Sequence, residues 1–439
     1  MHTIDDNWKL KKFLLDLGQL PYTSSNNEII SIWKAIFDDY NLESSRLSGV
    51  VLDGGANFQL AGRKFVHNTT ARVIWCFCHR MHLVIKYLFK KGPPELKNIH
   101  TRACNIVSKF ARSWKFSYTF RVQQEKFGSS GTLIQSIPTR WNTCFDMFRS
   151  LVKNKEAVQQ ALEEENFSNL GLTDTEWLIM EVLVQWSKCI TETIDFMQSD
   201  TQSRIDCAFP RLAALQHEAQ KLITKKKFPG QDRQNINTIA FAINLGKALK
   251  CALNQYFPIN EVIVTGIGER QSKKSYNLLV FACWLNPAFN SFDFLPPEEA
   301  SLHQIYCQTK AQKYINNQRS IRTPTATTTG WHANSLNEMR QQNQSTPNRI
   351  VSEVDSEIKR FQDEHAESDD SLEWWKKNVE RFPLLSQIAK KILCIPPSSA
   401  TSERSFSASG LIITPLRNGL DEKTARKLTR IAFNKKSFE

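Results

Sequence analysis

A short apolar run that stops at a glycine-bounded turn constrains the fold of this chain more than any other feature. Leu47 to Leu52 leads into Asp53-Gly54-Gly55, and such a run is typical of a buried strand. Val73 to Trp75 indicates a second short strand, and a helix opens at His82 to Phe89. Because strands that alternate with helices favour an α/β unit, we expect residues 1–150 to form one.

The remainder of the chain has the apolar pattern of helices. A chain of 439 residues exceeds what one hydrophobic core usually holds, so two or three structural units are expected. Residues 151–345 form the predicted helical domain, and a polar tract near 310–349 is predicted to be a mobile linker. Residues 350–439 regain the helical period. The individual predictions are a partial edge strand at Trp8–Leu15, an N-cap at Ser371, and helices at Asn27–Tyr40, Asp174–Met197, Ile236–Tyr256, Ile350–Phe361, Leu384–Leu393, Ser398–Ser405 and Lys423–Phe433.

The charge balance favours a polyanionic partner. The chain has 57 Lys and Arg against 44 Asp and Glu, a net charge of +13, and basic side chains on phosphates release condensed counterions. The alternative is a basic surface that only keeps the protein soluble. Ten cysteines without a CxxC pair indicate reduced thiols. A signal peptide and a long apolar span are both lacking, so the expected compartment is cytosol or nucleus, with no membrane partner.

The most specific pattern lies near the C-terminus. Residues 371–417 contain Phe382-Pro383-Leu384-Leu385, then Ser398-Ser399-Ala400, then Ser402-Glu403-Arg404. In this order they resemble the dimerisation segment of hAT-superfamily DNA transposases. The apolar side chains of this segment either pack within the chain or meet a second copy. With the resemblance, we predict a homodimer or higher homo-oligomer held by Trp374, Trp375, Phe382, Leu384, Leu385, Ile388 and Leu393.

Two carboxylates are candidates for catalysis. In the family that this chain resembles, the Glu of Ser-Glu-Arg completes an RNase H-like acidic triad, and here it is Glu403. Asp53, in Val51 to Asn57, resembles the second acid of that triad, at the end of a strand. Such triads hold Mg²⁺ through hard oxygen ligands. The alternatives are a surface ion pair for Glu403 and a strand-ending turn for Asp53.

Further motifs follow the family's order. Cys76 and His79 resemble its Cys-x-x-His and are expected near the active site; zinc binding is set aside because no partner pair appears. Arg140-Trp141 resembles its Arg-Trp, where the ring stacks on a DNA base, although a core Trp is equally consistent. In Phe281 to Phe289, Asn286 and Ala288 replace the family's Asp and Arg. Other candidate phosphate contacts, each alternatively a solvated surface residue, are Lys225-Lys226-Lys227, Lys273-Lys274, Arg404 and Arg417.

The resemblance implies an RNase H-like α/β core, interrupted by a large helical insertion, with a C-terminal helical dimerisation segment in residues 350–439. The first acid of the triad and the family's BED-type zinc finger would precede residue 1, so a truncated copy is expected. Hence we predict a transposase-derived nuclear protein that dimerises and binds DNA without strand transfer, and with no resident cofactor. One alternative is an active Mg²⁺-dependent transposase whose first Asp lies upstream. Another is a protein-interaction scaffold.

Overall fold

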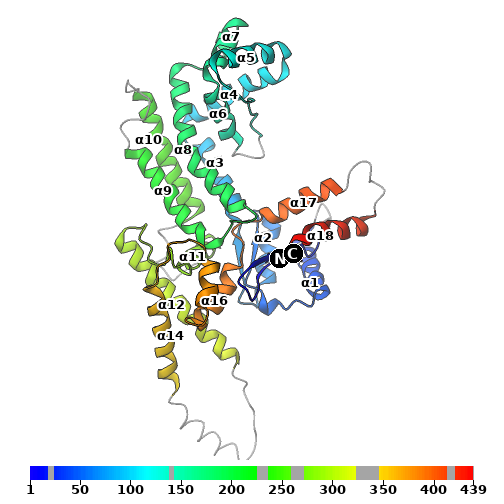
Figure 1. Cartoon of the computed structure of the whole chain (residues 1–439), viewed down its shortest axis with the longest axis vertical. Coiled ribbons are helices and arrows are strands. Elements are labelled where there is room, and N and C mark those ends of the chain that lie inside the picture. The colour runs from blue at the N-terminus through cyan, green and yellow to red at the C-terminus, as the bar shows by residue number, and fades with distance from the viewer. Residues whose placement is uncertain are drawn as a thin grey trace, which may run out of the picture. The chain divides into compact units, whose positions relative to one another are not determined.

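The computed structural model describes residues 1–17, 24–137, 143–224, 236–258, 271–322, 346–412 and 421–438 (Figure 1). The chain divides into two compact units. Unit 1 comprises Met1–Cys76, Asp200–Pro210 and Glu261–Glu439, and unit 2 comprises Phe77–Ser199 and Arg211–Asn260. Unit 1 is thus interrupted after Cys76 and resumes at Asp200, and the domain boundary predicted near residue 150 stays a prediction. None of the described helices is long and apolar enough to cross a membrane.

Helices dominate the described residues, and the strands are few and short. In unit 1, β1 (His2–Ile4) pairs antiparallel with β2 (Leu10–Lys12), and β3 (Gly49–Leu52) pairs in parallel with β4 (Arg72–Trp75). The two strands that the apolar runs predicted are thus present. Among the described residues the structure is mostly helical, with two two-stranded sheets, where the sequence predicted an α/β unit.

The predicted edge strand at Trp8–Leu15 is shorter than expected. Trp8 has a φ of 62°, in the left-handed region, so the chain turns there and β2 begins only at Leu10. The buried Trp8 ring stacks on Trp375, with 6.1 Å between ring centroids. Residue 8 therefore serves as a core anchor rather than a strand position.

The parallel strand pair is covered by helices of unit 1. A small core of Leu52, Val66, Ala71 and Val73 lies between the pair and α2 (Ala56–Phe65). A Cβ on Gly62 would lie 2.6 Å from Leu52 Cδ1, so glycine lets α2 approach the strand closely. The helix predicted at residues 27–40 is confirmed as α1 (Asn26–Asp39), which follows a Ser25 capping box and packs on α2, and a short turn η1 (Ser44–Arg46) precedes β3.

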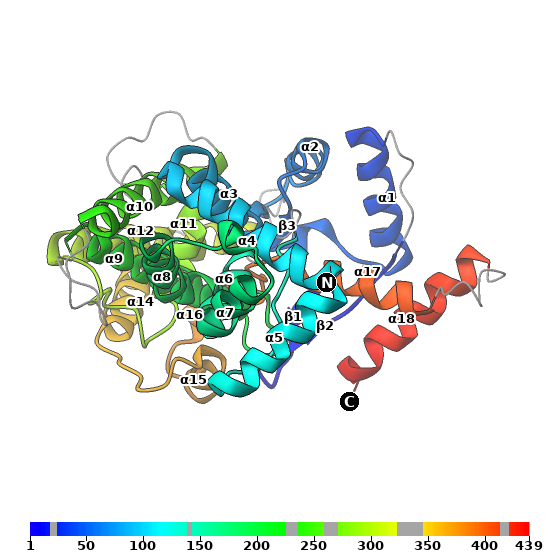
Figure 2. The same cartoon turned by 90° about the horizontal axis from the view of Figure 1, so that it is seen from above.

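The C-terminal part of unit 1 consists of helices around a buried aromatic cluster. Most predicted helices in 350–439 are confirmed with bounds shifted by a few residues; the helix after Asp370 is capped by Asp370, one residue before the predicted cap at Ser371. Packing between α17 and α18 brings the last two helices side by side (Figure 2). The elements are η3 (Ile205–Cys207), α11 (Gln271–Trp284), α12 (Pro297–Arg322), α14 (Thr346–Gln362), α15 (Ser371–Asn378), α16 (Pro383–Leu393), α17 (Ala400–Ile412) and α18 (Glu422–Phe438).

The predicted linker near 310–349 is helical at both ends. Helix α12 continues to Arg322, because Cys307, Ala311 and Ile315 recur every four residues and are buried. At the other end, α14 already begins at Thr346. Residues 323–345 lie outside the described residues, so the linker prediction is not tested there.

Unit 2 is built from helices, as predicted for the middle of the chain. The helices predicted at 174–197 and 236–256 are confirmed, and Thr173 and Glu176 form a capping box at the start of the first. Helix α5 packs on α7 and α4, and α10 packs on α3 and α8. The elements are α3 (Phe77–Lys91), α4 (Pro94–Arg112), α5 (Trp114–Phe127), α6 (Thr143–Lys153), α7 (Lys155–Glu164), η2 (Ser168–Leu170), α8 (Asp174–Gln198), α10 (Ile236–Tyr256) and α9 (Ala208–Thr224), whose first residues belong to unit 1.

Candidate site at the carboxyl ends of β3 and β4

Asp53 directly follows β3 and is exposed at the end of the strand. Its Oδ1 accepts a hydrogen bond of 3.0 Å from the Gly55 N–H, which closes the turn into α2. Its main-chain carbonyl accepts from the Gln59 side chain. These contacts are those of a strand-ending turn, which is the alternative to a catalytic role that the sequence left open for Asp53. They also fix the carboxylate at the carboxyl end of the parallel pair.

Cys76 occupies the equivalent position after β4. Leu52 and Trp75 are paired in the ladder, and the Cys76 N–H donates to the Leu52 carbonyl at 2.7 Å. The buried Cys76 Sγ accepts a hydrogen bond of 3.3 Å from the Ser399 N–H. The residue that precedes α17 is thereby attached to the end of β4, although 323 positions separate the two in the chain.

Glu403 lies in the first turn of α17, one turn after Ser399. The Ser399 hydroxyl donates to Glu403 Oε1 at 3.3 Å, and the Ser399 carbonyl accepts from the Glu403 N–H at 3.2 Å. Glu403 is exposed. A chain of bonded and hydrogen-bonded neighbours therefore leads from Asp53, through Leu52, Cys76 and Ser399, to Glu403, and both acids belong to unit 1.

Arg404, a predicted DNA contact, is already paired within the chain. Its guanidinium forms an ion pair with the Asp200 carboxylate at 2.5 Å, and Lys12 Nζ lies 3.8 Å from the same carboxylate. An arginine in such a pair has to exchange partners before it can bind phosphate. Arg404 therefore contributes to holding α17 as well as to the basic surface.

Comparisons with known proteins agree with these motifs. Residues 354–434 match the hAT family C-terminal dimerisation region, and residues 74–186 match the ZBED1 RNase-like helical domain. The chain is 20% identical to the Putative AC transposase of Zea mays over 98% of its length. It is an hAT-family transposase-like protein. The resemblance seen in the sequence is thus confirmed.

Other relatives of this hAT-like protein carry BED zinc-finger names. It is 20% identical to Zinc finger BED domain-containing protein RICESLEEPER 2 of Oryza sativa subsp. japonica over 93% of this chain. It is 21% identical to Zinc finger BED domain-containing protein 4 of Homo sapiens over 92% of this chain. The chain spans 53% of the maize protein, 58% of the rice protein and 32% of the human protein.

The donor set around Asp53 and Glu403 does not by itself fit the magnesium ions that an acidic triad would hold. Within the described ranges, no group of three or more His, Cys, Asp or Glu side chains could hold a metal ion. The Asp53 carboxylate accepts from Gly55, and Glu403 accepts from Ser399. Asp53 and Glu403 therefore do not form a metal site by themselves.

The residues predicted to hold a dimer are mostly core residues of unit 1. Trp375, Phe382, Leu385, Ile388 and Leu393 are buried within the chain, and Trp374 and Leu384 are half-buried. The Trp375 indole N–H donates to the Leu285 carbonyl at 2.8 Å, and its ring stacks on Phe361. The alternative kept open from the sequence, intrachain packing, is thus the one that the structure adopts, because α14, α11 and β2's preceding turn supply the apolar partners.

Several predicted residues cannot be placed at this site. Arg140, Trp141, Arg417 and Lys225-Lys226-Lys227 lie outside the described residues, and the described part of Lys273-Lys274 is limited to their backbone in α11. His79 lies in the first turn of α3, partly buried, in unit 2. Their predicted roles stay predictions.

A buried polar cluster near Asn286 was not anticipated. Asp206 is fully buried, and its Oδ2 accepts from Asn286 Nδ2 and from the Ser371 hydroxyl, each at 2.7 Å. Arg204 Nε lies 3.6 Å from Asp206 Oδ1. Burial raises the pKa of Asp206 despite this arginine. The sequence signal available was the replacement of the family's Asp by Asn at position 286: an amide can donate to Asp206, whereas a carboxylate cannot.

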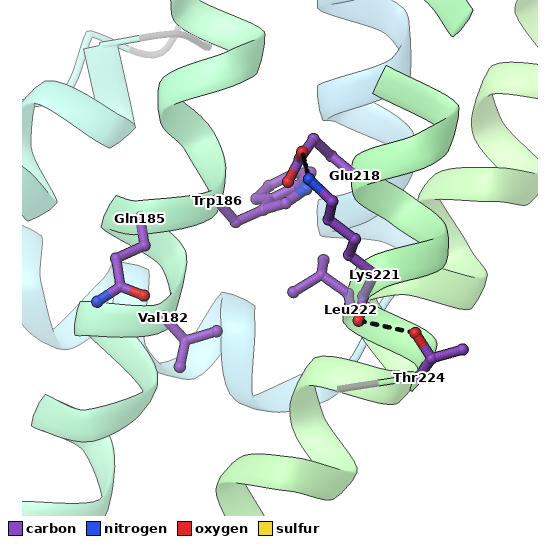
Figure 3. Close-up of a pocket in the computed structure, with 7 residues that line it drawn as sticks. All are labelled: Val182, Gln185, Trp186, Glu218, Lys221, Leu222 and Thr224. Carbon is purple, nitrogen blue, oxygen red and sulfur yellow. Dashed lines mark hydrogen bonds and ion pairs between the residues drawn. The ribbon is translucent and has the colours of Figure 1, made fainter. Parts of the chain in front are cut away.

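A pocket of about 450 Å³ lies in unit 2 (Figure 3). It is lined by α8 and α9, and Lys221 Nζ donates to Glu218 Oε1 at 2.7 Å along α9. Among the residues that the structure describes, none of the predicted site residues lines it. Its lining residues are Val182, Gln185, Trp186, Glu218, Lys221, Leu222 and Thr224.

Proposed function

We propose that this protein is an hAT transposase-derived nuclear protein that self-associates through its last helices and binds DNA, and that this chain alone does not carry out strand transfer. The match of residues 354–434 to a dimerisation region carries the proposal. A nuclear location is proposed because the partner is DNA and eukaryotic relatives are named as transposases. Mg²⁺ would belong only to an active form.

The surface proposed for self-association lies on α17 and α18. Phe406 and Ile431 each expose 59% of their surface, and Leu428 is also exposed. All three fall within the matched dimerisation region, and we call them the C-terminal apolar surface. Burying such side chains against a second copy stabilises a complex by roughly 25 cal/mol per Å² of apolar area. A second copy is the proposed occupant because the matched region has this role in the family.

Sedimentation of the full chain tests self-association. We expect the wild-type chain to form an assembly larger than a monomer. Ile431→Glu should raise the dissociation constant of that assembly at least tenfold, because a carboxylate would be buried in the interface. Ile305→Glu is the matched control, since Ile305 exposes 58% of its surface on α12 outside the matched region. A monomeric wild-type chain, or an Ile431→Glu chain that assembles like wild type, would overturn the proposal.

DNA binding is supported by the net charge of +13. We expect the chain to bind duplex DNA with an affinity that falls steeply as salt rises from about 50 to 200 mM, since phosphate contacts release counterions. Fluorescence anisotropy over that range measures the slope. Undetectable binding at low salt would sink this part and favour a protein-interaction scaffold.

The lack of strand transfer is proposed because Asp53 and Glu403 alone supply too few ligands. We propose that β3, β4 and α17 are parts of an RNase H-like arrangement, in which these two acids face one cleft. The test is cleavage of a labelled transposon-end duplex with Mg²⁺ or Mn²⁺. Equal absence of product from wild type and Glu403→Gln is the expected result. Cleavage that depends on Glu403 would contradict it and favour the alternative of an active transposase.

A further inference from the structure

The charge of unit 2 is divided sharply between two groups of helices. Residues 77–127, which form α3, α4 and α5, contain eleven Lys or Arg and two Glu, a net charge of +9. Residues 143–198, which contain α6, α7 and α8, hold four Lys or Arg and ten Asp or Glu, a net charge of −6. Most of the chain's excess of +13 therefore belongs to three consecutive helices. Such a concentration favours an anionic partner.

Helix α5 combines this charge with exposed aromatic rings. Trp114 exposes 81% of its surface and Tyr118 exposes 63%. Together with Arg121 they are spaced i, i+4 and i+7, so they share one face of the helix. The opposite stripe, formed by Phe116, Phe120 and Gln123, is buried. Large aromatic side chains held outward on a well-packed helix indicate a binding surface.

Two exposed arginines lie close to these rings in the sequence. Arg112, at the end of α4, and Arg121 are exposed, and neither forms an ion pair with any described residue. Lys115 is paired with Glu165 at 2.6 Å, so α5 is fixed to the acidic side of the unit without using either arginine. One carboxylate, Glu125, follows on the same face. The net charge around Trp114 remains positive.

We propose that Arg112, Trp114, Tyr118 and Arg121, the α5 face, bind a nucleic-acid strand whose bases are unpaired. Aromatic rings at this exposure stack on bases, and guanidinium groups pair with the phosphates between them. A duplex hides its base faces and can use only the arginines. A symmetric contact between the α5 faces of two copies is disfavoured, because two segments of +9 repel each other. The inference rests on the proposed nucleic-acid binding and specifies its chemistry.

The test compares a single strand of about 20 nucleotides with a duplex of the same sequence by anisotropy. Wild type is expected to bind the single strand more tightly. Trp114→Ala/Tyr118→Ala is expected to weaken single-strand binding on the order of tenfold, since each stacked base contributes, and duplex binding less than about twofold. Phe127→Ala is the control: Phe127 is partly exposed but lies on the buried stripe of the same helix.

The outcomes separate this inference from the proposed function. Wild type that binds neither strand nor duplex would overturn both. If wild type binds DNA and the double variant binds single strands as tightly as wild type does, only the proposal for the α5 face is overturned. Polyglutamate that displaces the single strand as well as an unlabelled oligonucleotide does would also overturn it, because charge without stacking would then suffice. Circular dichroism melting confirms that the exposed substitutions leave the fold intact.

Discussion

At the residue scale, the side-chain amide of Asn286 is complementary to the buried carboxylate of Asp206. Its amide donates to Asp206 Oδ2 and to the Asp369 carbonyl, and its Oδ1 accepts from the Ala288 N–H. Asn286→Asp would place two carboxyl groups in contact inside the core. We expect a loss of about 2–4 kcal/mol of unfolding free energy, measured by urea denaturation at neutral pH.

The control for that substitution is Asn105→Asp, which makes the same charge change at an exposed position on α4. It should leave stability nearly unchanged. The deficit of Asn286→Asp should shrink as pH falls, because one proton then relieves the repulsion between the two carboxyl groups. A deficit that is equal at acid and neutral pH would refute the electrostatic explanation.

His303 gives a second residue-scale prediction. It is buried against Phe209 and Phe292, and burial lowers its pKa to about 4 from 6.5. The folded protein therefore holds neutral histidine, so its stability is complete above pH 6.5 and is lost as pH falls from 6.5 towards 4. Wild type should therefore lose up to about 3 kcal/mol of unfolding free energy as the pH falls, and His303→Phe should not show this loss. Denaturation across pH measures it; His217→Phe, at an exposed position, should retain the wild-type pH dependence.

At the element scale, periodicity predicted helices such as α1, α8, α10 and α16, but not the contacts that complete their ends. Helix α16 begins at Pro383 and has no side-chain cap from its own N-cap residue. Buried Glu357 of α14 supplies it, since its Oε1 accepts from the N–H groups of Leu384 and Leu385 at 2.9 and 2.7 Å. We expect Glu357→Ala to cost about 2 kcal/mol in chemical denaturation, against almost nothing for the exposed Glu353→Ala. Equal costs would disprove the remote cap.

The same scale explains which predictions failed. An apolar residue such as Trp375 has the same sequence signal whether it packs within its chain or against a second copy. Here Trp375 packs within its own chain, against the Leu285 carbonyl and the rings of Trp8 and Phe361. These partners are distant from Trp375 in the sequence. Local signals did better: the apolar run before Asp53 correctly placed a strand end, and the helix predicted from Ser398 begins at Ala400. The Cys76–Ser399 contact depends on tertiary packing, so no local pattern could predict it.

At the scale of the whole molecule, self-association and the α5 face make a joint prediction. An assembly presents two or more α5 faces, so a strand long enough to reach two of them is held by both at once. Wild type should therefore gain on the order of 10- to 100-fold in affinity between strands of about 10 and 60 nucleotides. In Ile431→Glu, each monomer offers one α5 face. Its affinity should rise only by the smaller factor that comes from the larger number of binding sites on the longer strand. Ile305→Glu should behave like wild type. If Ile431→Glu sediments as a monomer yet keeps the full gain, the avidity does not come from the C-terminal apolar surface.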